Sequence, residues 1–104
     1  MKENEGKKVI VRSRIAGVHA GIIEKHEGNE VILKDAYRLW RVFTRDKNGS
    51  VSDIAAKGLM EGKEHQIGAK LKSVTIVEPQ GLELAEMTDE AYESLDAWTY
   101  KYLA

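Results

Sequence analysis

The stretch VILKDAYRLWRVF at residues 31–43 decides the fold, because it packs β-branched, aromatic and arginine residues into two strand-like runs. Asp35 and Ala36 interrupt the apolar pattern between the runs and mark a bend. The pattern therefore predicts one strand at residues 30–34 and another at residues 37–43.

Side chains alternate between the two faces of a strand, so Arg38 and Trp40 are expected to share a face while Arg41 points the other way. The remaining apolar positions of the stretch are expected to build the β core. These positions are Val31, Leu33, Leu39 and Phe43.

Upstream of this stretch, residues 8–15 and 18–26 also alternate in the manner of strands. Gly28 and Asn29 accept the positive φ of a hairpin turn, so a tight turn is expected between the second and third strands. Residues 1–7 are expected to form a polar leader. The segment 8–43 is predicted to be a β-meander.

Downstream, residues 50–59 have helical spacing and a cap at Ser50 or Ser52, and a polar connection follows at residues 60–69. Residues 70–85 are predicted to hold a strand that ends before Pro79 and then a short edge strand. Thr88 is the expected N-cap of a C-terminal amphipathic helix at residues 88–98.

These elements predict an α+β fold in a single domain, residues 1–104. It would be a curved antiparallel sheet or small β-barrel-like meander of five or six strands, with one short helix and a C-terminal amphipathic helix.

Composition excludes several classes of protein. The chain of 104 residues has no cysteine, so disulfides and thiolate chemistry are absent. Its apolar runs are too short for a membrane span, and its charged start is not a secretory signal. No nucleophile or phosphate-loop motif is present, and His19 and His26 fall on opposite faces of one strand. We therefore expect a non-enzymatic cytoplasmic protein without a metal or cofactor.

Charge is divided unevenly along the chain, although the net charge is only −1. Residues 78–96 contain acids and no base, while every arginine lies in the first half. Either the two halves neutralise each other, within a subunit or between subunits, or the arginines serve an anionic ligand. The arginines are Arg12, Arg14, Arg38, Arg41 and Arg45.

The predicted ligand site collects side chains that can stack on a base and hold a phosphate, if the strands bring them to one edge of the sheet. It consists of Arg12, Arg14, His19, Arg38 and Trp40. The alternative is that Trp40 is core and that the arginines pair with Glu83, Glu86 or Asp89.

Aromatic and apolar residues recur along the C-terminal helix. They fit either the chain's own core or an interface with a partner subunit. The possible interface residues are Tyr92, Leu95, Trp98 and Tyr102.

The run VIVRSRIAGVHAGIIEKHEGNEVILKDAYRLW, residues 9–40, resembles a family of small phage and prophage proteins, the domain of unknown function DUF6948. The pattern AGVxxG corresponds to residues 16–21, EVxL to residues 30–33, the end of RRLW to residues 38–40 and its helix to residues 51–58. Tyr37 replaces the first arginine of RRLW. The resemblance implies a phage-type accessory protein in the host cytoplasm and supplies no activity.

Three functions follow as hypotheses. The preferred one is a homo-oligomeric binding protein that captures an anionic, nucleotide-like ligand, such as a host nucleotide signal. The alternative is an interaction module that inhibits or redirects a host protein. Nucleic-acid binding comes third, because a balanced net charge gives no general attraction to phosphate backbone.

Overall fold

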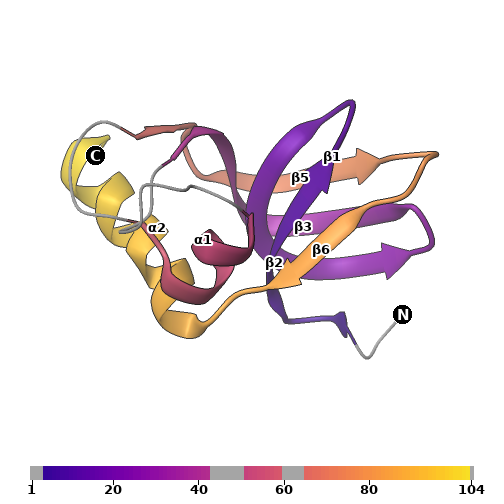
Figure 1. Cartoon of the computed structure of the whole chain (residues 1–104), viewed down its shortest axis with the longest axis horizontal. Coiled ribbons are helices and arrows are strands. Elements are labelled where there is room, and N and C mark those ends of the chain that lie inside the picture. The colour runs from indigo at the N-terminus through magenta and orange to yellow at the C-terminus, as the bar shows by residue number, and fades with distance from the viewer. Residues whose placement is uncertain (1–3, 43–50, 60–64, 104) are drawn as a thin grey trace.

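The computed structural model describes residues 4–42, 51–59 and 65–103. It confirms the α+β class, because a curved, open antiparallel sheet of six strands lies beside two helices (Figure 1). The elements in chain order are β1 (Lys8–Ser13), β2 (Gly17–Glu27), β3 (Glu30–Arg41), α1 (Val51–Lys57), β4 (Gln66–Ile67), β5 (Leu71–Val77), β6 (Glu83–Glu86) and α2 (Asp89–Tyr102).

Strand β3, which contains most of the opening stretch, is central to the sheet. The strand order is β4-β3-β2-β1-β6, with β5 also paired to β3. One edge of β3 pairs with β2, and the other edge is divided between β5 and β4. The expected edge strand near residues 82–85 is β6. The two-residue strand β4 was not expected, because it lies inside a segment predicted to be a polar connection.

The prediction of two strands in the opening stretch is wrong, because β3 runs unbroken from Glu30 to Arg41. The bend is nevertheless present as a bulge: Asp35 has a φ of 49°, and Asp35 and Ala36 together lie opposite Gly21. Leu33 before the bulge and Ala36 after it pack in the same core cluster, although they differ by an odd number of positions. The bulge therefore reverses the alternation of the strand without ending it.

Both faces of the sheet carry a hydrophobic cluster. On the helix face, Ile10, Tyr37 and Leu39 pack with buried residues of both helices. The opposite face contains Val11 and Leu33 among others, and that cluster also includes Ile76 of β5 and Leu84 of β6. Since β5 and β6 lie at opposite ends of the strand order, their shared cluster shows how strongly the sheet curves.

Helix α1 is shorter than the predicted residues 50–59. Ser52 lies inside it and is not its cap, while Ser50 and Phe43 fall outside the described residues. Gly58 follows the helix with a φ of 77°, and a Cβ there would approach Ser94 Oγ to 2.6 Å. Glycine at this position lets the end of α1 pack closely against α2.

Helix α2 begins as predicted. The Thr88 hydroxyl accepts a hydrogen bond from the Ala91 N–H at 3.0 Å, and Asp89 and Glu90 occupy the first turn. The helix continues to Tyr102, one turn beyond the predicted end at residue 98. Within the described part of the chain, neither helix has the length and apolar character needed to cross a membrane.

Ion pairs join the basic first half to the acidic second half within this one chain. Arg12 Nε lies 2.9 Å from Glu83 Oε1, and Lys8 Nζ lies 3.0 Å from Asp89 Oδ1. These observations favour neutralisation within a subunit. Because the pairs are largely exposed, each contributes at most about 1 kcal/mol to stability.

Candidate functional site

The five residues of the predicted ligand site do not meet in one place. Arg12 pairs with Val18 across β1 and β2, whereas His19, the next residue of β2, pairs with Arg38 across β2 and β3. Neighbouring residues of a strand point to opposite faces. Arg12 therefore lies on the helix face and Arg38 on the other, which corrects the expectation that they share a pocket.

Arg12 and Arg14 both have partners of their own. Arg12 pairs with Glu83, as the alternative interpretation of the arginines proposed. Arg14 Nη1 donates to Gln80 Oε1 at 3.0 Å. Both line a hollow of about 380 Å³ near the turn between β1 and β2. The charge of Arg12 is already compensated there.

Arg38 and Trp40 share a face, as expected, and they contact each other. The Arg38 guanidinium lies 3.9 Å from the centre of the Trp40 ring, which is a cation–π stack. Trp40 is 63% exposed, so the alternative that places it in the core is wrong. No carboxylate among the described residues forms an ion pair with Arg38.

His19 adds a second polar side chain beside Arg38. His19 is buried, and its Nδ1 and Arg38 Nε lack a hydrogen-bond partner within the described part of the chain. Burial, reinforced by the charge of Arg38, lowers the pKa of His19 below its ordinary value of 6.5. The imidazole is therefore neutral at pH 7 and does not repel the guanidinium.

Gly17 makes room for the Arg38 guanidinium, a role that the sequence did not indicate. Its φ is +84°, and a Cβ built on it would lie 2.5 Å from Arg38 Nη2. Gly68, the residue after β4, supports the same residue by donating its N–H to the Arg38 carbonyl at 2.8 Å. We call His19, Arg38 and Trp40, with Gly17 beside them, the Arg38 site.

Glu78 also has a role that its place in the acidic stretch 78–96 did not indicate. It is 1% exposed, and its carboxylate accepts hydrogen bonds from Ser13 Oγ at 2.8 Å and from the Ile15 N–H at 3.2 Å. The Ser13 bond is the main cause that lowers the pKa of Glu78 from 4.5, against the opposing effect of burial. Glu78 thereby fastens the turn that leads into Gly17.

Most of the proposed interface residues of α2 lie in the chain's own core. Tyr92, Leu95 and Trp98 are buried, and the Tyr92 hydroxyl donates to the Asp35 carbonyl at 2.7 Å. A partner could not contact these three side chains without opening the fold. Tyr102 is partly exposed, so it alone of the four offers surface to a partner.

A charged cluster joins α2 to β3. The Tyr37 hydroxyl donates a hydrogen bond to Asp96, and Lys70 Nζ lies 3.0 Å from Asp96 Oδ1. Burial, with help from the hydrogen bond to Asp96, raises the pKa of Tyr37 well above its ordinary value. Its hydroxyl stays protonated at neutral pH, so it acts as a structural donor.

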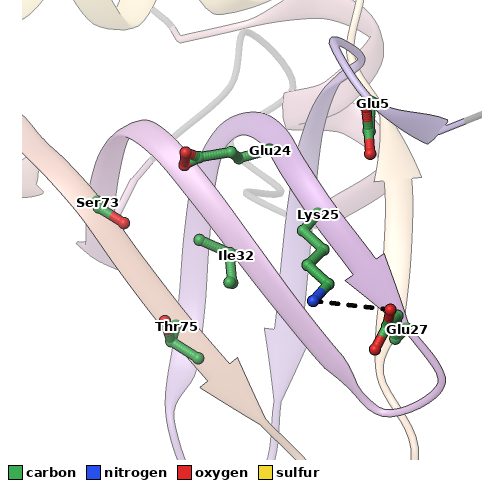
Figure 2. A pocket seen from close by; sticks show the side chains of 7 residues that line it. All are labelled: Glu5, Glu24, Lys25, Glu27, Ile32, Ser73 and Thr75. Carbon is green, nitrogen blue, oxygen red and sulfur yellow. Dashed lines mark ion pairs between the residues drawn. The ribbon is translucent and has the colours of Figure 1, made fainter. Parts of the chain in front are cut away.

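A second hollow, of about 630 Å³, lies on the sheet away from the Arg38 site (Figure 2). Lys25 and Glu27, both on β2, form an ion pair at 3.7 Å along one side of it (Figure 2). In the described residues, no three His, Asp or Glu side chains are grouped as metal ligands. The residues that line the hollow are Glu5, Glu24, Lys25, Glu27, Ile32, Ser73 and Thr75.

Comparison with known proteins identifies the family of this chain. Neither the curated proteins nor the solved structures contain a match to the chain. A family model matches residues 6–95, which span all the sheet strands and the first half of α2. The chain therefore belongs to the family described as Domain of unknown function (DUF6948).

Proposed function

We propose that this protein is a non-enzymatic binding protein that captures an anionic, nucleotide-like ligand at the Arg38 site. One observation carries the proposal: Arg38 stacks on an exposed tryptophan and has no carboxylate partner among the described residues. Arg12, which like Arg38 lies within a strand, is paired with Glu83.

The stack leaves the guanidinium suited to an anion. A guanidinium that lies face-on against an indole keeps its N–H donors in its own plane, where two of them can bind a phosphate or carboxylate together. The Trp40 ring offers apolar surface to a base, and base–aromatic stacking contributes about 1 to 3 kcal/mol. The Arg38 charge thus suits the phosphate of a nucleotide, and the Trp40 ring suits its base.

His19 supports the same ligand class. Its neutral imidazole has an unpartnered Nδ1, and the Nε of Arg38, its cross-strand neighbour, is also unpartnered within the described residues. Buried polar atoms without a partner favour a bound group that pairs with them. Arg12 and Arg14 lie outside this arrangement, so the proposed ligand contacts are limited to His19, Arg38 and Trp40.

The wider role is proposed on the family resemblance and on chain size. We propose a phage-type accessory protein that acts as a homo-oligomer in the host cytoplasm and sequesters a host nucleotide signal. The resemblance supports the setting, and a small domain of this size gains stability from association.

Titration calorimetry with cyclic and linear nucleotides tests ligand capture. At least one nucleotide should bind. Arg38→Lys should weaken its affinity tenfold or more, because lysine keeps the positive charge but lacks the planar set of N–H donors and the stacking on Trp40. Arg12→Lys is the matched control and should leave the affinity unchanged. Absence of heat with every nucleotide, or equal effects of the two substitutions, would contradict the proposal.

A further inference from the structure

The geometry points to a homodimer formed through β5, in which two copies pair antiparallel about a two-fold axis at Val74. This inference goes beyond ligand capture and gives the proposed oligomer a specific surface.

Strand β5 presents an edge suited to pairing. It pairs with β3 on one side, and no strand within the described residues lies along its other side. Its register with β3 contains no shift, although Asp35 and Lys72 are not paired, whereas the β2–β3 and β3–β4 pairings both contain shifts. A regular edge without proline or bulge is the kind that pairs with another strand, and Lys72 is its only charged residue.

The sequence of β5 is self-complementary about its centre. Leu71, Ser73, Thr75 and Val77 share one face, in the order apolar, hydroxyl, hydroxyl, apolar. Leu71 and Val77 are 44% and 53% exposed, so both apolar side chains can contact a second copy. In an antiparallel pair centred on Val74, each of these two lies opposite the other in the second copy, and Ser73 lies opposite Thr75.

Symmetry restricts the register. A two-fold axis perpendicular to the sheet keeps each face on the same side, so only residues of the same face can lie opposite each other. The Val74 centre uses all seven residues of β5 and places Lys72 opposite Ile76. A centre at Lys72 would set two like charges opposite each other and would leave Val77 uncovered.

Ser73 and Thr75 are accessible for a direct test of this register. Both are exposed on β5, and Figure 2 shows them along the outer side of the hollow, with Ile32 of β3 next to them. Charges at these two positions should therefore be tolerated by a single copy. In the proposed dimer they would face each other across the axis.

Light scattering coupled to size exclusion, from micromolar to millimolar protein, measures the outcome. The unmodified protein should dimerise with rising concentration. Ser73→Asp with Thr75→Asp should give a monomer, because like charges meet at both symmetric positions. Ser73→Lys with Thr75→Asp should retain the dimer, because opposite charges meet there.

Three results would overturn the inference: a monomer for the unmodified protein at every concentration, a dimer for both double variants, or a monomer for both. Circular dichroism establishes that each variant is folded. Nucleotide titration of the same variants separates the two proposals, since neither position belongs to the Arg38 site. A ligand-binding monomer would therefore reject the dimer and leave ligand capture standing.

Discussion

Alanine at Gly17 should displace the Arg38 guanidinium without unfolding the protein. The new Cβ would lie 2.5 Å from Nη2 and 2.9 Å from Cζ, whereas ordinary contacts begin at 3.4 Å. The guanidinium must therefore move by about 1 Å. Because it is the end of a flexible side chain, it moves readily, and its 3.9 Å contact with the Trp40 ring must change.

The backbone contributes a separate effect that a control removes. Gly17 has a φ of +84°, and a non-glycine residue in this left-handed region costs about 1 to 2 kcal/mol. Gly6 has nearly the same φ, +86°, and no neighbour within 4 Å of a built Cβ. Gly6→Ala and Gly17→Ala should thus lose similar stability in urea denaturation.

Only Gly17→Ala should alter the Arg38 site. The assay is the change in tryptophan fluorescence, to which Trp40 and Trp98 both contribute, together with the NMR signal of the Arg38 Nε–H, followed by nucleotide titration. We expect both signals to shift and affinity to fall in Gly17→Ala and to stay unchanged in Gly6→Ala. Equal signals in the two variants would refute the steric role of Gly17.

Acid should destabilise the protein in two steps. The pKa of His19 is lowered in the folded state, so its contribution to the free energy of unfolding is complete above about pH 6.5 and declines as pH falls. The pKa of Glu78 is also lowered, so its contribution to the free energy of unfolding declines below about pH 4.5. When the free energy of unfolding is measured by urea denaturation across pH, the upper step should be absent in His19→Gln and the lower step absent in Glu78→Gln. The exposed Glu24→Gln is the control and should keep both steps. Asp96→Asn should cost about 1 to 2 kcal/mol, because the Tyr37 and Lys70 bonds lose a charged acceptor, and unchanged thermal stability would argue against this cluster. Trp98→Leu should cost about 3 kcal/mol by leaving a cavity in the core, whereas Trp40→Leu should change the unfolding free energy by less than about 0.5 kcal/mol; equal losses would contradict their different burial.

Local patterns predicted the elements that depend on neighbouring residues. The turn at Gly28, the cap at Thr88 and the shared face of Arg38 and Trp40 all follow from rules that operate over a few positions. The exposure of Trp40 did not follow from such rules, because an aromatic residue in a strand fits a core equally well. Its burial depends on which elements cover the end of β3.

Long-range pairing explains what the sequence left open. The two-residue strand β4 has no periodicity of its own and exists only because β3 offers an edge. In the sequence, Glu78 is only an acidic residue at the end of a strand. Its hydrogen bond from Ser13 exists because the curved sheet places the turn after Ser13 next to it. Gly17 likewise gains its role only when β2 and β3 place Arg38 against it.

The face of Arg38 depends on two irregularities that offset each other. Between the hairpin turn and His19, β2 contains an extra residue at Glu24, and β3 contains an extra residue at Asp35. After both, His19 again lies opposite Arg38, in the register that the turn itself sets through Glu27 and Glu30. A one-residue slip moves every side chain of a strand to the other face. Without the Asp35 bulge, Arg38 and Trp40 would therefore point toward the helices, and the apolar side chains of Tyr37 and Leu39 would take the face now held by the Arg38 site.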